Sequence, residues 1–236
     1  MVEFTYAVGR IRALEAQLLD ESQIIRLVDA KDFETAFLVL RENANYAEKI
    51  DRLPDSFDLE ALLENELLWT KSLLADLAPG NKFLTVLWKK YDPSLTLNEY
   101  LAILKKSLGQ ECPPLFTKYV RGYIILHQLR TDILNGQADL NTAQNKYKYT
   151  DYDRVISVGL EQYKKTGSLF ALEREIDDHL TDAVKKARYC SFGIEPLIGF
   201  LIAKEMEIKI LRLILVAKKM QVKTDKIKER LRHSYV

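Results

Sequence analysis

The sequence predicts an all-α protein, a compact bundle of about ten helices, on three observations. Apolar residues recur at spacings of three and four along most of the chain, as they do on the buried face of a helix. Alternating runs of β-branched residues, which would predict strands, are not found in the sequence. Residues 192–219 form one long run that is apolar nearly all round, as in a helix enclosed by other helices.

The first forty residues predict three helices. The first is expected to end near Asp20, and its apolar face is formed by Phe4, Ala7, Ile11, Leu14 and Leu18. A short second helix is expected over about 24–28. Asp32 can cap the third helix, because an aspartate side chain accepts hydrogen bonds from the unpaired amides of a first turn.

The middle of the chain predicts a further series of helices. The polar stretch 43–57 indicates a possible hinge within what is otherwise expected to be a single all-helical domain over residues 1–236. Asp58 then caps a longer, leucine-rich helix, which Pro79 brings to an end. Other helices are expected over about 83–91, 97–108, 115–134, 152–166, 169–189 and 225–233. Glycines that suit the ends of such helices are Gly109, Gly136 and Gly167.

The run 192–219 is the most informative part of the chain. Pro196 stands where a first helical turn accepts proline. At 100° per residue, one apolar flank is formed by Leu197, Leu201, Ile208, Leu211 and Leu215. A narrow charged stripe is formed by Glu205, Lys209 and Arg212. Lys204 and Glu207 interrupt the apolar surface, three residues apart and therefore close enough to pair. We expect this helix to lie inside the bundle.

The composition is that of a folded, charge-balanced protein. Hydrophobic residues make up 47% of the 236 residues and the net charge is +1. Nucleic acid is therefore not an expected partner, because it selects a basic surface. Uncharged runs fall short of the roughly 18–20 residues of a membrane span, and the first residues predict no signal peptide. Cys112 and Cys190 form no disulfide framework, so a cytoplasmic protein with reduced thiols is expected.

No pattern in the chain predicts catalysis, a cofactor or a metal. His127, His179 and His233 are far apart in the sequence and lack a second ligand at metal spacing. The acidic residues around His179 are expected to coat a solvated helix face; they are Glu173, Glu175, Asp178 and Asp182. Residues 80–82 form a turn without the glycine spacing of a phosphate-binding loop. We therefore predict no catalytic, cofactor-binding or metal-binding residues and no direct nucleotide binding.

Two segments have both a functional and a purely structural interpretation. Arg10, Arg12 and Glu15 could form a ridge that meets a partner, or they could be the polar side of an amphipathic helix. Residues 145–152 hold three tyrosines in a polar setting, and tyrosine suits interfaces because its ring is apolar while its hydroxyl stays hydrated. This second segment is predicted to be either a contact surface or a loop packed on its own body.

The two ends of the chain carry short motifs in a recognisable order. Near the C-terminus these are Glu-Pro-Leu at 195–197, Ala-Lys-Glu at 203–205, Glu-Ile-Lys at 207–209 and Leu-Arg at 211–212. Near the N-terminus they are Tyr-Ala-Val at 6–8, Arg-Ile-Arg-Ala-Leu-Glu at 10–15 and Ala-Lys-Asp-Phe-Glu at 30–34. Together they resemble the central-stalk C-subunit family of V/A-type rotary ATPases, whose eukaryotic members are called the d subunit, and this chain looks like a short member. The likeness covers about half of the chain and is weak from about Asn45 to Asp151.

The resemblance implies a fold that the residue patterns alone do not. Members of the family are built from tandem three-helix units, arranged as a funnel around a pseudo-threefold axis. This chain is shorter than typical members by about one such unit, which leaves a closed funnel and an open wedge as alternatives. The N- and C-terminal helices are expected to pack together.

The resemblance also implies a non-catalytic coupling subunit of a proton- or sodium-transporting rotary ATPase. Its partners would be the shaft subunits of the central stalk and the membrane proteolipid ring. It would lie on the cytoplasmic side, associated with the membrane only through that ring, and would need no cofactor. The alternative is a free-standing helical adaptor or regulatory protein that shares the fold.

Overall fold

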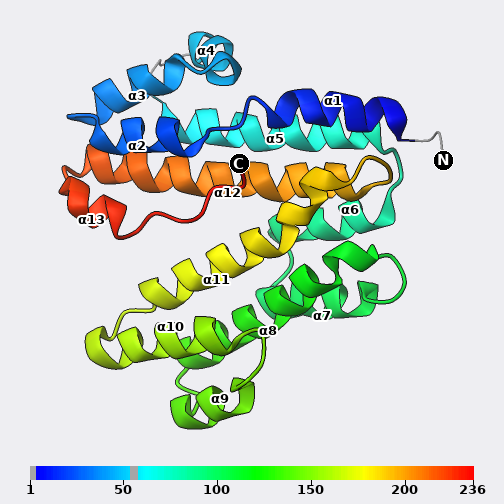
Figure 1. Ribbon diagram of the computed structural model, residues 1–236, viewed down its shortest axis with the longest axis vertical. Helices are drawn as coiled ribbons and strands as arrows, with labels where there is room; N and C mark the ends of the chain where they lie inside the picture. The colour runs from blue at the N-terminus through cyan, green and yellow to red at the C-terminus, as the bar shows by residue number, and fades with distance from the viewer. Residues whose placement is uncertain (1–3, 54–57) are drawn as a thin grey trace. The chain divides into compact units, whose positions relative to one another are not determined.

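The computed structural model describes residues 4–53 and 58–236, which form thirteen α-helices and three short 3₁₀ helices without a strand (Figure 1). The predicted all-α class is therefore confirmed. These residues divide into two compact units. Unit 1 consists of the described residues up to Pro79 together with Ala187–Val236, and unit 2 consists of Gly80–Lys186. The single domain, the three-helix repeat and the funnel or wedge stay predictions. None of the described helices is both long and apolar enough to cross a membrane.

Unit 1 combines helices from both ends of the chain. They are α1 (Thr5–Glu15), α2 (Glu21–Asp29), α3 (Phe33–Arg41), α4 (Ala44–Asp51), α5 (Leu59–Leu77), α12 (Glu195–Lys219) and α13 (Thr224–Lys228). The predicted caps Asp32 and Asp58 accept backbone amides of their first turns. The first helix ends at Glu15, earlier than predicted, because Asp20 is extended and caps α2 in a reciprocal capping box with Gln23.

Helix α4 fills most of the predicted hinge. Asn43 caps it, and its buried Tyr46 and Ile50 belong to the main core of unit 1. A short polar sequence becomes helical here because two side chains on one face are anchored by the rest of the unit. Residues 54–57 of the predicted hinge lie outside the described residues.

Helix α12 is the centre of unit 1, as predicted. Its apolar flank is buried, including Leu201, Leu211 and Leu215 at 1% exposure or less. Helices α1, α3, α5 and α13 all contact it, so that the N- and C-terminal helices do pack together. The charged stripe departs from the prediction at one position: Lys209 and Arg212 are exposed, but Glu205 is buried by the packing around the first half of the helix.

Unit 2 is continuous in sequence. Its helices are α6 (Lys82–Trp88), α7 (Leu97–Ser107), α8 (Thr117–Leu134), α9 (Leu140–Tyr147), α10 (Asp153–Thr166) and α11 (Phe170–Val184), with short 3₁₀ helices η1 (Lys89–Tyr91) and η2 (Pro114–Phe116). Helices α10 and α11 pack most closely at Gly159, where an added Cβ would lie 2.8 Å from the Cα of Leu172. The turn between them is closed by Gly167 at φ 68°, as its predicted role requires.

Two further helix ends and one additional helix differ from the prediction. The segment predicted as one helix over 169–189 tightens into the 3₁₀ helix η3 (Lys185–Tyr189) after α11. The helix predicted over 225–233 ends at Lys228. Helix α9 was not predicted, because it has eight residues and only Ala143 is buried, so its sequence has little apolar periodicity.

Candidate functional site

A cluster of buried charges joins α12 to α5 in unit 1. The Nζ of Lys204 lies 2.6 Å from Oε1 of Glu66 on α5 and 2.8 Å from Oε1 of Glu207, one turn further along α12. Lys204 and Glu66 are 2% and 0% exposed. The pairing of Lys204 with Glu207 confirms the prediction from their spacing. One ammonium group therefore pairs with two carboxylates that have almost no contact with water.

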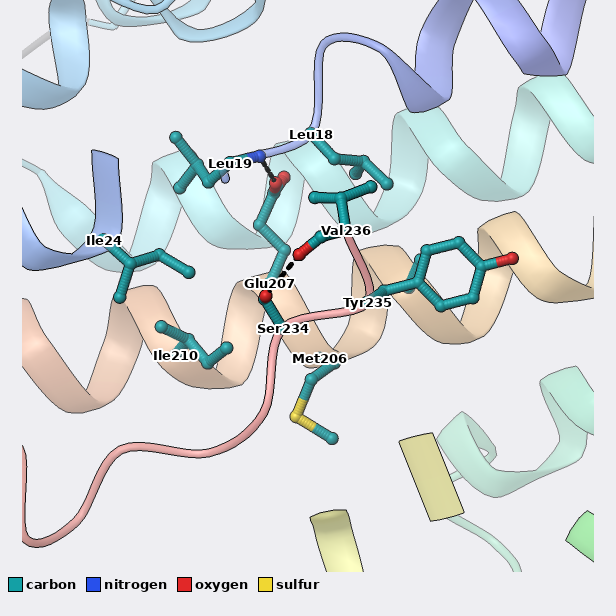
Figure 2. Close-up of a pocket in the computed structure, with 10 residues that line it drawn as sticks. Leu18, Leu19, Ile24, Met206, Glu207, Ile210, Ser234, Tyr235 and Val236 are labelled. Atoms are coloured by element: carbon teal, nitrogen blue, oxygen red, sulfur yellow. Dashed lines mark hydrogen bonds between the residues drawn. The ribbon is translucent and has the colours of Figure 1, made fainter. Parts of the chain in front are cut away.

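The second carboxylate also reaches the N-terminal segments of the chain. Oε1 of Glu207 accepts the hydroxyl of Tyr46 on α4 at 2.6 Å, and Oε2 accepts the backbone amide of Leu19 at 2.6 Å. Figure 2 shows Glu207 extending from α12 towards Leu19, which lies in the connection between α1 and α2. A single side chain thus satisfies polar groups from other segments of the unit, as a buried carboxylate requires.

A half-buried lysine completes the cluster at its outer side. Lys49 on α4 pairs with Glu66 and donates to Oδ1 of Asn45 at 2.8 Å. Its Nζ lies 4.1 Å from the centre of the Trp69 ring, in cation–π geometry. The cluster then contains two carboxylates and two ammonium groups, so that the buried charge is balanced.

The pKa shifts show how the charges support one another. Burial would raise the pKa of Glu66, but Lys204 and Lys49 outweigh it and hold that pKa below its ordinary value. Burial would lower the pKa of Lys204, but Glu207 and Glu66 outweigh it and raise that pKa. Burial, assisted by the two carboxylates, raises the pKa of Tyr46 well above its usual range. Glu66 and Lys204 are therefore ionised at neutral pH, with Tyr46 as a hydrogen-bond donor. Burial lowers the pKa of Lys49, an effect that Glu66 opposes.

A shallow pocket lies next to this cluster (Figure 2). It has about 270 Å³ of empty space, part of it open to solvent, and its lining is mostly apolar. The residues around it are Leu18, Leu19, Ile24, Ala203, Met206, Glu207, Ile210, Ser234, Tyr235 and Val236. Because both oxygens of Glu207 already accept hydrogen bonds, the pocket offers little to orient a ligand.

The two arginines of the ridge predicted on α1, Arg10 and Arg12, make different contacts. Arg12 donates to the backbone oxygens of Ala187 at 2.8 Å and Cys190 at 2.5 Å and pairs with Glu15, so it fixes the segment that precedes α12. Arg10 is exposed, and its guanidinium donates to the hydroxyl of Tyr6 at 3.3 Å, one turn earlier on the same helix. Arg12 is therefore used within unit 1, but Glu15 is buried and does not belong to the solvated polar side of the helix that the structural interpretation described.

The last described residues also contact α1 and the segment that precedes α12. Tyr235 is buried, and its hydroxyl lies 3.4 Å from Oε1 of Glu15. Arg188 donates to the backbone oxygen of Tyr235 at 3.2 Å. Burial raises the pKa of Glu15, an effect that Arg12 only partly offsets. These contacts hold the last residues against α1 and the start of α12.

The segment 145–152 packs on its own unit, as one of its two predicted interpretations requires, and its role as a contact surface stays a prediction. The ring of Tyr147 packs edge-on to that of Tyr152 at 6.3 Å, and Tyr152 packs in turn on His179 at 5.5 Å. Tyr149 is 88% exposed. The loop is therefore packed on its own unit through two of its tyrosines and presents the third to solvent.

The histidines and cysteines do not assemble into a site. His179 is half-buried, and its Nε2 has no hydrogen-bond partner within the described part of the chain. Burial raises the pKa of the Cys112 thiol to about 11, which disfavours the reactive thiolate. Among residues 4–53 and 58–236, no group of three or more His, Cys, Asp and Glu side chains is placed to hold a metal ion. The absence of catalytic, cofactor and metal residues stays a prediction.

Sequence reasoning paired Lys204 with Glu207 but missed their other partners, which are Glu66, Tyr46 and the amide of Leu19. The signal for Glu66 is present, because it stands at helical spacing from the buried Leu62, Leu59 and Leu73 and so falls on the apolar face of α5. An acidic residue on such a face requires a buried counter-charge. No comparable signal exists for the backbone amide of Leu19.

These features define an all-helical scaffold whose central helix is tied to its neighbours by buried charges. Comparison with known proteins then specifies the family. The family model described as ATP synthase (C/AC39) subunit matches residues 7–94 and 102–230. The chain belongs to this family. The match includes most of the middle segment, where the motifs alone gave only a weak likeness.

Individual relatives agree with this assignment. The C subunit of an A-type ATP synthase from Methanosphaera stadtmanae is 25% identical over 229 residues, which are 95% of this chain and 57% of that protein. Its counterpart from Methanocaldococcus jannaschii is 28% identical over 167 residues, 56% of this chain and 41% of that protein. The C subunit of a V-type sodium ATPase from Enterococcus hirae is 35% identical over 86 residues, 36% of this chain and 26% of that protein. The chain spans about half the length of the curated relatives it matches. No solved structure matches it significantly.

Proposed function

We propose that this chain is a non-catalytic central-stalk subunit of a V/A-type rotary ATPase, which couples the rotating shaft to the membrane proteolipid ring. The observation that carries the proposal is the family match over residues 7–94 and 102–230. The buried cluster supports it, because a part that transmits torque must resist deformation. Close-packed interiors transmit strain, and Glu66, Lys204 and Glu207 join α12 to three other segments through buried ion pairs and hydrogen bonds.

The proposed partners are the shaft subunits and the ring, on the cytoplasmic side of the membrane. The test is affinity purification through a tag on this chain from gently solubilised membranes. We expect the catalytic, shaft and ring subunits to be recovered together. In complexes that lack the chain, we expect ATP hydrolysis to continue without ATP-driven ion transport. Recovery of the chain alone would contradict the proposal.

The subunit is proposed to bind no nucleotide and to have no ATPase activity of its own. The turn at residues 80–82 is occupied by the N-terminal cap of α6, where Oδ1 of Asn81 accepts the amide of Leu84 at 3.0 Å. This capping geometry already uses one amide that a phosphate would need. Calorimetric titration of the purified chain with Mg-ATP should show no heat of binding, and saturable binding at micromolar concentration would overturn this part.

A free-standing helical adaptor is the second candidate. Like the first candidate, it needs an all-helical scaffold and no catalytic residues. The purification described above separates the two candidates, because an adaptor would be recovered without the ring. A gene that lies among those for the other motor subunits would favour the first candidate, and an isolated gene would favour the second.

A further inference from the structure

The connection between α9 and α10 is a tight turn that its own hydrogen bonds hold in place. The amide of Thr150 donates to the carbonyl oxygen of Tyr147 at 3.1 Å, and its hydroxyl donates to the same oxygen at 2.5 Å. The amide of Tyr149 donates to Oδ2 of Asp153 at 2.9 Å. Lys148 has φ −55° and ψ 135°, and Tyr149 has φ 64°. These values fit a type II β-turn.

Tyr149 occupies the position at which a type II turn favours glycine. A bulky residue at positive φ is unfavourable, and burial does not compensate here, because the side chain is 88% exposed. The ring contributes little to the packing of unit 2, while Tyr147 and Tyr152 form the packed base of the turn. Residues kept in a strained conformation without a packing role are candidates for a functional one.

Two lysines accompany the exposed ring. The Nζ of Lys148 lies 5.1 Å from the centre of the Tyr149 ring, and the Nζ of Lys146 lies 5.1 Å from that of Tyr147. Lys148 lies near enough to Asp153 to help lower the pKa of that carboxyl, whose side chain accepts the amide of Tyr149, and Asp151 pairs with Lys118 at 3.0 Å. Both lysine side chains are exposed. The apex of the turn therefore presents two ammonium groups and one aromatic ring together, on a backbone that is already ordered.

We propose that this turn, residues 146–149, contacts the headgroups of acidic phospholipids. The inference rests on the proposed function, which brings the chain to a membrane surface. Ammonium groups are attracted to anionic headgroups, and the tyrosine ring prefers the headgroup layer because it is apolar at one end and polar at the other. We favour a membrane surface over an acidic groove on another protein. The turn offers charge and one aromatic ring, but no extended surface that could be complementary in shape to a protein groove.

The contact is weak by itself. Each lysine near an anionic membrane raises partitioning about fivefold, so the two together contribute roughly 25-fold. This is too little to hold the chain at a membrane alone, in agreement with the expectation that the ring brings it there. Once the chain is held close, the high local concentration makes a weak contact effective.

The test uses the full chain tethered artificially, without any motor subunit. A fluorophore is placed on Asn145→Cys, an exposed position on α9, with Cys112 and Cys190 replaced by serine. The protein is attached through a terminal histidine tag to vesicles that contain a nickel-chelating lipid and a lipid-borne quencher. Vesicles of phosphatidylcholine with and without phosphatidylglycerol are compared. We expect stronger quenching with phosphatidylglycerol, and its loss at high salt because screening weakens the attraction.

Two variants make the result specific. The variant Lys146→Ala/Lys148→Ala should lose the extra quenching. The control variant Lys89→Ala/Lys90→Ala should keep it, because it removes the same charge from η1 in the same unit, where Lys90 also lies 5.1 Å from a tyrosine ring.

Replacement of the strained residue separates binding from folding. Tyr149→Gly should lower the quenching on both kinds of vesicle, yet melt at the same or a higher temperature than the parent, because glycine accepts positive φ without strain. Equal quenching on the two kinds of vesicle, or equal loss in the lysine variant and its control, would overturn the inference. Failure of the proposed function would instead appear in the purification experiment, which this assay does not involve.

Discussion

Replacement of Lys204 by methionine tests whether the buried cluster holds unit 1 together. Methionine is also unbranched and close to lysine in length, and it removes the charge that Glu66 and Glu207 share. Removal of one partner from a buried ion pair costs about 3–5 kcal/mol, because the remaining charge is left without compensation. Total stabilities are about 5–15 kcal/mol, so the expected loss is a large fraction of the free energy of unfolding.

The structure offers a matched control on the same pair of helices. Arg212 of α12 pairs with Glu60 of α5 at 3.0 Å, and both side chains are about half exposed or more. Exposed pairs contribute less than about 1 kcal/mol. Urea unfolding followed by circular dichroism should therefore show a much lower midpoint for Lys204→Met than for Arg212→Met.

The pH dependence gives an independent check. Glu66 has a lowered pKa, so its stabilisation is present above its ordinary value of 4.5 and is lost as the pH falls through the folded value. Lys204 has a raised pKa, so its stabilisation is present below 10.5 and is lost as the pH rises above that value. The difference in the free energy of unfolding between the parent and Lys204→Met should be largest between these two pH limits. It should become smaller in acid. Adding Glu66→Gln to Lys204→Met should restore part of the stability. If Lys204→Met and Arg212→Met unfold at the same urea concentration, the reasoning from buried charge is refuted.

Three further predictions concern packing and protonation. Leu211 is fully buried on α12, so Leu211→Asp places an unpaired carboxylate in the core and should leave the chain close to unfolded; a melting temperature within a degree or two of the parent would show that the helix is not internal. Gly199→Ala would set a Cβ 2.6 Å from that of Ala187 and should cost about 1–3 kcal/mol by overpacking. Gly9→Ala on α1 meets nothing within 4 Å, and should instead be neutral or stabilising by up to about 1 kcal/mol in the same thermal melt. Burial lowers the pKa of His179 below 6.5, so folding favours the neutral ring. The free energy of unfolding should therefore decrease as the pH falls through 6.5. In the variant His179→Phe, urea midpoints measured between pH 5 and 7.5 should no longer show this decrease.

The helices that sequence predicts well are those with strong local signals. Asp58 caps α5 and Gly167 ends α10, since capping and positive φ are set within a few residues. The enclosed position of α12 follows from an apolar surface that leaves no face for water. The short helices α4 and α9 carry only one or two buried residues each. Their helical state depends on contacts made elsewhere in the unit, which local periodicity does not record.

In the buried cluster too, the sequence predicts contacts between neighbouring residues but not contacts between distant segments. Lys204 and Glu207 could be paired from the sequence because helical spacing fixes the distance between them. Glu66 could be placed on the apolar face of its own helix but not beside a particular lysine. Tyr46 and the amide of Leu19 come from segments 161 and 188 residues away from Glu207 along the chain. No spacing rule connects residues across such a separation.

The order in which unit 1 is assembled has a consequence during synthesis. Its two parts are separated along the chain by the 107 residues of Gly80–Lys186. At typical translation rates, the ribosome needs on the order of 10 seconds to make that intervening segment. Until α12 emerges, the N-terminal helices lack part of the packing around Leu27, Phe37 and Leu62, which belong to the same core as α12. Newly made chains should therefore expose an apolar surface for seconds, and should depend on chaperones more than a protein of this size with a continuous core.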